Sequence, residues 1–398
     1  MLHGTCYMVV GIDIRNIGKQ RTGDETVFFN LVKNLALIDG KNEYRLFTDI
    51  TDVKMLQNIK EKLGIGNKNN FQIISLTPTL SLRERGLWRI FNNKFTWNLW
   101  ALPNYLRRNP VDIYHTQYIL PFCINKKIKL ITTIHDISFN IYPGLIKRTD
   151  LFFLKILIPR SLKRADKILA VSEFTKKEIT DFYGISSEKI TVVHNSGGED
   201  LSSEIPEEKL LAVRKKYNLS EKFILYLGTM QPRKNLPVLL ETLAKLKNSG
   251  WQLVLAGKIN DYNQDPKIDS TIKKFSLEKE VIFTGFVAEP EKAALFKLAR
   301  VFCFPSLYEG FGIPILEAMR MGTPAVVSDI PPHREVAGET VLYFSPQNAE
   351  DLKAKIIEIE ENADLREQLI RNAKARAQNF SWKKTAEKTL EIYQGLGK

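Results

Sequence analysis

The stretch PSLYEGFGIPILEAMRMGTP at positions 305–324 decides the fold of this 398-residue chain. It follows a short apolar run that is typical of a buried strand. Gly310 and Gly312 permit a tight loop in which the backbone can approach another group closely. Pro314 suits the first turn of a helix and Gly322 suits the residue just after its end, so a helix is predicted between them. The free N–H groups at the start of that helix, with its positive dipole end, suit a phosphate.

Two carboxylates belong to the same pattern, Glu309 in the loop and Glu317 in the helix. Beside a phosphate they cannot serve as phosphate ligands, but they can accept hydrogen bonds from the vicinal hydroxyls of a sugar or a ribose. The alternative is an ordinary capped helix with two solvated glutamates. The glycines, the proline and the paired glutamates together favour a binding site.

Outward from this stretch, short β-branched or aromatic runs alternate with amphipathic helical patterns. In the second half, strands are predicted at 223–227, 252–256, 281–285, 301–305 and 324–328, and helices at 236–247, 290–299, 313–321, 349–361, 364–378 and 381–396. In the first half, strands are predicted at 8–14, 44–48, 71–76, 111–114, 130–134, 167–171 and 190–193, and helices at 25–38 and 150–163. Such alternation predicts βαβ units and parallel sheets covered on both faces.

The stretch GGEDLSS at 197–203 interrupts this alternation and marks an interdomain linker. We therefore expect an α/β protein of two doubly wound domains, 1–200 and 201–380. Ligands of such sheets bind at the carboxyl ends of the strands, so the expected site is a cleft between the domains.

The composition is that of a folded protein, with 44% apolar and 26% charged residues, and it excludes wholesale disorder. The net charge of +13 is uneven, because residues 1–200 hold 29 basic and 19 acidic residues whereas residues 201–398 hold 29 and 26. The basic first half suggests an anionic partner, which leaves nucleic acid, a phosphorylated substrate and an anionic membrane surface open.

No metal or disulfide pattern is present. The three cysteines, Cys6, Cys123 and Cys303, are odd in number and far apart, and the sequence has no Asp-x-Asp motif. We expect a reducing compartment and no bound metal. No apolar run approaches the roughly 20 residues of a spanning helix, and no signal-peptide pattern opens the chain, so a cytoplasmic location is expected, with any membrane contact at its surface.

The 305–324 stretch resembles the E-x7-E motif of the retaining GT-B glycosyltransferases of family 4. Further landmarks of that family are LYLGTMQPRKNL at 225–236, VLAG at 254–257, VIFTGFV at 281–287, EVAG at 335–338 and FSWKKTA at 380–386. The resemblance is strong over 165–398 and weaker over 1–164. It implies the GT-B architecture, two Rossmann-like domains that face each other across a cleft. It also implies that the last helix, within 381–398, packs back on the N-terminal, acceptor-side domain.

The resemblance also implies roles for single residues. Glu317 is expected to hold the ribose of a nucleotide-sugar donor, and Glu309 the hydroxyls of the donor sugar. Arg233 and Lys234 follow a strand and a proline, where two adjacent cations can neutralise a leaving pyrophosphate, although an Arg-Lys pair can also be a solvated turn. The expected donor-binding residues are Gly23, Gly228, Gly310, Phe311, Gly312, Ile313 and Glu317, the diphosphate lying against the backbone at Gly312 and Ile313.

The first half adds two candidates. Gly23 precedes a predicted helix, which again suits an anion, but Asp24 follows it, so the loop is no P-loop and can be a simple turn. His135 follows an apolar strand, where the family often has His-Asp near the donor sugar; the alternative is a satisfied structural histidine. We interpret His194 as hinge structure and assign no role to the remaining histidines, His3, His115 and His333.

The predicted function is transfer of a hexosyl group from a nucleotide-diphosphate sugar to a glycan or lipid-linked acceptor, with retention, in polysaccharide or glycolipid assembly. GDP-mannose is the first expectation for the donor and a UDP-sugar the second. His135, Arg233, Lys234 and Glu309 are the candidate catalytic residues, with no cofactor, no metal and no nucleic-acid partner. The alternatives are a nucleotide-sugar epimerase or a phosphorylase on the same architecture, or a non-catalytic basic protein that binds membrane or nucleic acid.

Residues 83–108 form a basic-aromatic segment, with six cations, one acid and six aromatic residues. This composition is typical of an interfacial surface, and we expect it to face an anionic membrane beside the acceptor side of the cleft. Nucleic-acid binding and a helix that packs its aromatic residues into the core are the alternatives.

Overall fold

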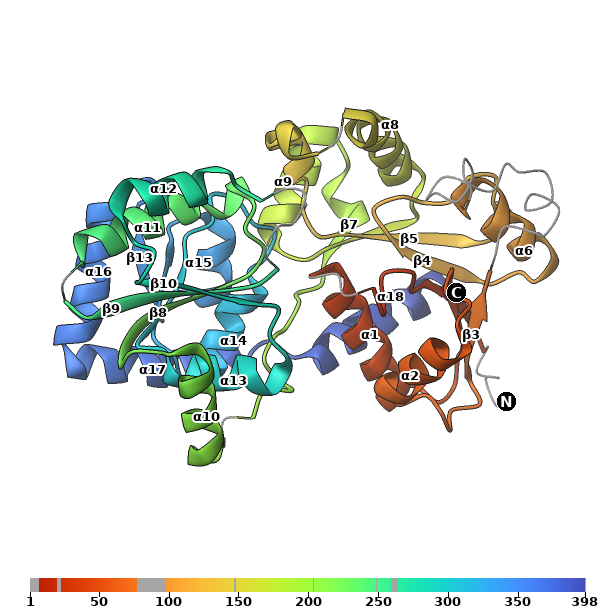
Figure 1. Ribbon diagram of the computed structural model, residues 1–398. Coiled ribbons are helices and arrows are strands. Elements are labelled where there is room, and N and C mark those ends of the chain that lie inside the picture. Colours follow the sequence, from red (N-terminus) through yellow and green to blue (C-terminus); the bar gives the residue numbers. More distant parts are fainter. Residues whose placement is uncertain are drawn as a thin grey trace.

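The computed structural model describes residues 7–19, 23–76, 97–146, 148–202, 204–247, 249–258 and 264–397. They form two α/β domains side by side, the N-terminal one from red to yellow-green and the C-terminal one from green to blue (Figure 1). Each domain is built on a single parallel sheet with helices on both faces.

The N-terminal sheet has seven strands in the order β3-β2-β1-β4-β5-β6-β7, all parallel. Its strands are β1 (Val9–Asp13), β2 (Glu43–Thr48), β3 (Phe71–Ser75), β4 (Ile113–Gln117), β5 (Lys129–Ile134), β6 (Lys167–Ala170) and β7 (Ile190–Val192). The strand order reverses between β1 and β4, and a ligand is expected at the carboxyl ends next to such a reversal.

Helices cover both faces of this sheet. The helices of the N-terminal domain are α1 (Asp24–Ile38), α2 (Val53–Leu63), α6 (Leu102–Arg108), the single turn α7 (Ser138–Ile141), α8 (Arg148–Arg164) and α9 (Glu173–Tyr183). One hydrophobic cluster joins the sheet to α1, and a second joins it to α6, α8 and α9. The sheet is therefore buried on both sides, as its apolar strand runs predict.

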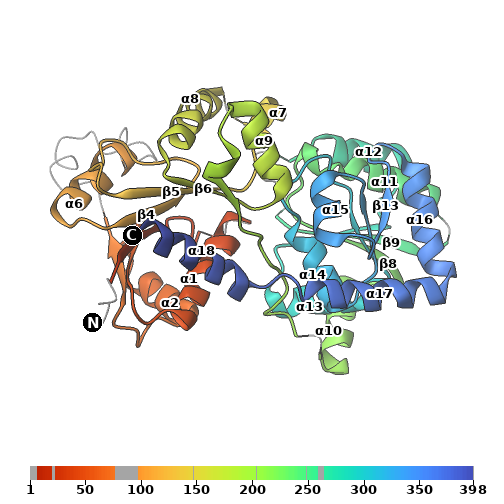
Figure 2. The same cartoon turned by 180° about the vertical axis from the view of Figure 1, so that it is seen from behind.

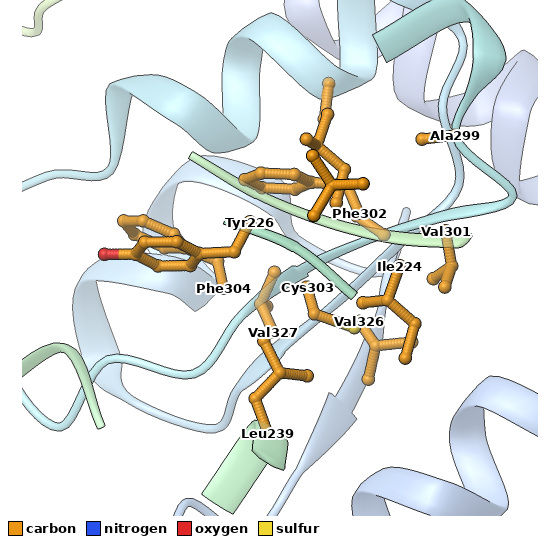
Figure 3. Close-up of a cluster of buried hydrophobic side chains, with 14 of the residues drawn as sticks. Ile224, Tyr226, Leu239, Ala299, Val301, Phe302, Cys303, Phe304, Val326 and Val327 are labelled. Carbon is orange, nitrogen blue, oxygen red and sulfur yellow. The ribbon is translucent and has the colours of Figure 1, made fainter. Parts of the chain in front are cut away.

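The C-terminal sheet has six strands in the order β10-β9-β8-β11-β12-β13. The strands are β8 (Lys222–Leu227), β9 (Trp251–Ala256), β10 (Val281–Gly285), β11 (Val301–Phe304), β12 (Ala325–Ser328) and β13 (Leu342–Phe344). The helices are α10 (Glu207–Tyr217), α11 (Leu236–Lys245), α12 (Lys267–Phe275), α13 (Glu289–Leu298), α14 (Ile313–Met321), α15 (Pro331–Ala337), α16 (Ala349–Glu361) and α17 (Ala363–Ala377). Side chains of β8, β11 and β12, among them Tyr226, Phe302 and Phe304, pack at the centre of the core (Figure 3).

The last helix, α18 (Trp382–Leu396), leaves the C-terminal domain and packs on α1 of the N-terminal domain (Figure 2). It begins where Ser381 accepts a hydrogen bond from the Lys384 N–H, a standard N-cap. Trp382 and Tyr393 are buried in the N-terminal core. The Tyr393 hydroxyl lies 2.7 Å from His115 Nδ1, and His115 Nε2 lies 2.7 Å from Thr133 Oγ1, so His115 is a structural residue.

The predicted fold class is confirmed, since two parallel sheets with flanking helices meet and the last helix crosses back. The boundary of β4 was wrong, because the strand was expected at 111–114 and spans Ile113–Gln117. Its buried polar side chains are satisfied within the fold, as in the hydrogen bond from Thr116 Oγ1 to Asp13. The sequence did not predict β13 or the helices α2, α6, α7, α9, α10, α12 and α15.

Candidate active site

Arg233, Lys234 and Glu309 form a buried charge cluster beyond the carboxyl end of β8. The turn after β8 ends in a short 3-10 helix, Pro232–Lys234, which presents both cations. Lys234 Nζ forms an ion pair with Glu309 Oε1, and Arg233 Nη1 lies 3.2 Å from Glu309 Oε2. The Ser306 hydroxyl donates to Glu309 Oε1 at 2.7 Å. Three residues that the sequence singled out therefore lie in direct contact.

The cluster holds more positive than negative charge. Burial alone would raise the pKa of Glu309, but the charges of Lys234 and Arg233 outweigh burial and hold that pKa at about 2. Burial and the neighbouring Arg233 lower the pKa of Lys234 to about 8, against the opposing effect of Glu309. Both cations contact the single carboxylate of Glu309, and the charge of Asp136 acts on them only from a longer range. The contacts of the cluster therefore leave room for a further anion.

Helix α14 begins beside this cluster. Gly312, with φ +117°, occupies the N-cap position, and no side chain of the described residues caps the helix. Pro314 lies in the first turn and Gly322 ends the helix with φ +72°, both as predicted. The uncapped N–H groups and the positive dipole end suit an anion.

Gly310 and Phe311 lie where the two domains touch. A Cβ atom at Gly310 would collide with the carbonyl oxygen of His135, so only glycine allows this approach. The Ser172 hydroxyl of the N-terminal domain donates to the Gly310 carbonyl at 2.6 Å. The Phe311 ring packs against His194 and Phe380 at the interdomain crossings.

His135 follows β5 and faces the start of α1. Its Nε2 lies 3.0 Å from Gln117 Oε1 and 3.9 Å from Asp24 Oδ1. Gln117 Nε2 donates to the Asp24 carbonyl at 3.4 Å. Gly23, with φ +50°, is the N-cap residue of α1, and a Cβ there would meet open space. The carboxyl ends of β4 and β5 and the Gly23 loop thus form one polar corner.

Glu317 belongs to a separate ion-pair cluster. Its side chain is buried, and Lys292 Nζ of α13 lies 2.7 Å from Glu317 Oε1 and 2.8 Å from Glu289 Oε2. Side chains at Gly197 and Gly198 would press on Ile313 and Glu317, so the linker packs directly on α14. The linker glycines thus have a packing role in addition to marking the boundary.

Gly228 lies where β8 and β9 end together. Its φ is +154°, and a Cβ at Gly257 would collide with the Gly228 carbonyl oxygen. Gly257 belongs to the VLAG landmark but is not among the predicted site residues. The two backbones meet in a way that leaves no room for a side chain.

Sequence reasoning missed several residues of the site. Three of them contact predicted site residues, namely Lys292 with Glu317, Gln117 with His135, and Ser306 with Glu309. No local sequence pattern singles them out. His194, interpreted as hinge structure, places its Nε2 within hydrogen-bond distance, 2.8 Å, of Glu335 Oε1 on α15 across the domains. His333 is buried, with Nδ1 2.9 Å from the Ser328 carbonyl.

A hollow of about 530 Å³ opens between α9 and α15, lined by Glu173, Phe174, Lys177, Glu178, Asp181, Pro331 and Glu335.

Of the basic-aromatic segment, residues 83–96 lie outside the described residues. Trp97 is buried, and the guanidinium carbon of Arg15 lies 4.6 Å from the centre of its ring, which fits the alternative that this segment packs aromatic residues into the core. Trp100, in contrast, is 68% exposed. Within the described part of the chain, no group of three or more metal-ligating side chains occurs, and no helix is long and apolar enough to cross a membrane.

Two family models match the chain. The model of group 1 glycosyl transferases matches residues 211–376, and that of glycosyltransferase family 4 matches residues 75–196. The O-antigen chain mannosyltransferase B of Escherichia coli is 27% identical over 381 residues, which cover 94% of this chain and 96% of that protein. The O-antigen chain mannosyltransferase RfbU of Salmonella typhimurium is 26% identical over 359 residues, covering 89% and 91%.

Solved structures share the fold. A glycosyltransferase from Rickettsia africae superposes with a TM-score of 0.74 at 20% identity, covering 98% of both chains. The Anabaena protein Alr3699/HepE, solved in complex with UDP-glucose, gives a TM-score of 0.73 at 17% identity, covering 98% of this chain and 100% of that one. The comparisons support neither the epimerase nor the non-catalytic alternative. With family matches in both domains and a GT-B fold, the chain belongs to the family 4 (group 1) glycosyltransferases and is an enzyme of that class.

Proposed function

We propose that this enzyme transfers a mannosyl group from GDP-mannose to a glycan or lipid-linked acceptor during the assembly of an O-antigen-like polysaccharide, with retention at the anomeric carbon. The similarity to two O-antigen mannosyltransferases supports the sugar and the class of acceptor. The observation that carries the proposal is the buried cluster of Arg233, Lys234 and Glu309, whose surplus positive charge lies at the uncapped start of α14.

In this proposal the donor diphosphate lies between the cations and α14. Arg233, Lys234 and the first N–H groups of α14 stabilise the negative charge that grows on the leaving diphosphate. Because these charges are fixed by the fold, they need no reorganisation during the reaction. Glu309 keeps both cations in place and offers its carboxylate to hydroxyls of the donor sugar, and Glu317 accepts from the ribose hydroxyls.

The acceptor reacts from the side of the N-terminal domain. His135 lies next to Gly310 and contributes to the donor-sugar pocket. The reaction needs no protein nucleophile, because a leaving phosphate oxygen takes the proton of the acceptor hydroxyl as the new glycosidic bond forms on the same face of the sugar.

The donor is tested by incubating the enzyme with GDP-mannose, GDP-fucose, UDP-glucose and UDP-galactose and an acceptor extract, and measuring nucleoside diphosphate release. We expect GDP-mannose to be consumed fastest, and an α-linked product by NMR. UDP-glucose is the sharpest rival, because the Anabaena protein was solved with it. Faster turnover of UDP-glucose would overturn the choice of donor but not the class of reaction.

The charge cluster is tested by Lys234→Ala. We expect turnover to fall by roughly 10²–10³, the usual loss for one preorganised electrostatic contact in an active site. Lys245→Ala is the matched control, because Lys245 forms an ion pair with Glu350 at the exposed surface of the same domain. Equal activity of the two variants would show that Lys234 does not bind the diphosphate.

We also propose that the N-terminal domain contacts an anionic membrane. Helix α8 exposes Phe152 (62%) and Ile156 (50%), four residues apart and therefore on one face. Arg148, Lys155 and Lys163 are exposed on the same helix, and none of them forms a side-chain ion pair within the described part of the chain. Exposed apolar side chains flanked by cations suit an anionic bilayer.

Vesicle binding tests this contact. Each cation near an anionic surface contributes about 1 kcal/mol, and the attraction is screened over about 10 Å at 0.1 M salt. We expect binding to anionic vesicles that falls with salt, no binding to neutral vesicles, and weaker binding by Phe152→Ser and Lys155→Ser. Activity on a water-soluble acceptor serves as the control. Wild-type protein that ignores anionic vesicles at low salt would favour a soluble acceptor.

A further inference from the structure

Lys292 of α13 reaches Glu317 of α14 from the neighbouring helix. Its Nζ lies 2.7 Å from Glu317 Oε1, and the two side chains are 12% and 8% exposed. The other partner of Lys292, Glu289, is 62% exposed. The contact to Glu317 is therefore shielded from water, whereas the contact to Glu289 lies open to it.

A buried carboxylate such as Glu317 needs a partner to remain ionised. Burial raises the pKa of Glu317, and Lys292 opposes this effect. Within the described residues, the polar contact of this carboxylate is made by Oε1, the oxygen that faces Lys292. The other oxygen, Oε2, remains available to a ligand.

Lys292 differs in charge balance from the cations of the diphosphate site. It lies between two carboxylates, those of Glu289 and Glu317. Arg233 and Lys234 instead contact one carboxylate between them, that of Glu309, and Asp136 acts on them from a longer range. The charge of Lys292 is already compensated, so it is poorly suited to bind an anion itself and well suited to hold a carboxylate in place.

We propose that Lys292 is a positioning residue of the nucleotide site, which anchors Glu317 through Oε1 and keeps it ionised so that Oε2 accepts from the donor ribose hydroxyls. The inference rests on the proposed function, because that function places the ribose at Glu317. Lys292 then acts on affinity for the nucleotide without touching it.

The experiment compares binding of GDP and of UDP to wild-type enzyme and to Lys292→Met, by calorimetry from about pH 6 to pH 9. Methionine keeps most of the length of the side chain and removes its charge. Near pH 7 we expect affinity to fall about tenfold, the worth of a hydrogen bond to a charged group. Without Lys292, burial keeps Glu317 protonated to higher pH, so the ratio of the two dissociation constants should approach one as the pH rises. Lys292→Arg should restore the affinity.

Two further variants separate positioning from direct contact and from a general effect on α13. In a Glu317→Gln background, Lys292→Met should change nucleotide affinity little, since the carboxylate that it holds is gone. This double variant also removes the unpaired buried charge, so it folds if charge burial is the only defect. Lys216→Met is the matched control, because Lys216 pairs with Glu291 of α13 at an exposed site and should leave affinity unchanged.

The outcomes are distinct. Three results together support the positioning role. Lys292→Met lowers the nucleotide affinity, the affinity recovers as the pH rises, and Lys292→Met changes the affinity little in the Glu317→Gln background. Wild-type affinity in Lys292→Met overturns it, as does an equal loss in both backgrounds, which would mean that Lys292 contacts the nucleotide. If wild-type enzyme binds neither GDP nor UDP, the proposed donor site fails first, and this inference fails with it.

Discussion

Three charged side chains share one buried site beyond β8, and their pKa values differ because their surroundings differ. Glu309 has a pKa of about 2 because two cations face it, so it stays ionised in all but strongly acidic solution. Lys234, buried next to Arg233, has a pKa lowered to about 8. The charge of the cluster is therefore fixed in acid and neutral solution and decreases in mildly alkaline solution.

The lowered pKa of Lys234 predicts that catalytic efficiency decreases at alkaline pH. As the pH rises through about 8, Lys234 loses its proton and the surplus positive charge disappears, so kcat/KM for the donor should fall. Lys234→Arg should lose this limb, because arginine keeps its charge throughout this range. The measurement is kcat/KM against pH for both enzymes, and a falling limb that survives in Lys234→Arg would assign it to another group.

The fixed cations also predict turnover without a divalent metal. In the proposed donor site, Arg233, Lys234 and the start of α14 supply positive charge of the kind that a metal ion can supply to a phosphate. We expect turnover of the correct donor to persist in EDTA. Loss of activity in EDTA that Mg²⁺ restores would contradict this account.

At the scale of elements, α14 was predicted with its observed bounds because its signals are local. Gly312, Pro314 and Gly322 each fix a backbone conformation at a helix end. Glu309 and the Arg233-Lys234 pair were each singled out from a short local motif, but their contact was not predicted, because Glu309 and Lys234 are 75 residues apart in the chain. Lys292 could not be predicted, because it reaches Glu317 from a different helix. β13 was missed because three residues are too few to show a period.

The end of α14 gives a test of stability. Gly322→Ala forces an L residue into φ +72° and presses on the flexible end of Lys374, and should destabilise the protein by about 1–2 kcal/mol. Gly64→Ala is the matched control, because Gly64 has φ +69° with open space around it. We expect similar losses of melting temperature in the two variants, since the end of Lys374 can move. A much larger loss at Gly322 would mean that the contact with Lys374 is rigid.

At the scale of the molecule, the domains touch where Gly310 meets His135 and where Glu335 of α15 accepts from the N–H groups of Glu173 and Phe174 at the start of α9. These contacts join the C-terminal domain, the proposed donor side, to the N-terminal domain, the proposed acceptor side. The sequence predicted that the domains face each other but not this contact, because backbone proximity across domains leaves no pattern in either segment.

Gly310→Ala tests whether this approach is needed for catalysis. The added methyl group would collide with the His135 carbonyl and hold the domains apart, while α14 and the cations stay in the same domain. We expect turnover to fall at least tenfold and free nucleotide to bind nearly as before. Gly395→Ala, at a position with open space, is the control. If Gly310→Ala keeps full turnover, the close approach has no part in the reaction.

Because β1 and α18 pack in one core, the C-terminal domain lies between two parts of the N-terminal domain along the sequence. The chain passes between the domains near Gly197 on the way out and near Phe380 on the way back. A chimaera with junctions at these two crossings would exchange the whole C-terminal domain, the proposed donor-binding domain, as one unit. Such a chimaera of two relatives should have the donor specificity of the protein that supplies the C-terminal domain and the acceptor specificity of the protein that supplies the N-terminal domain.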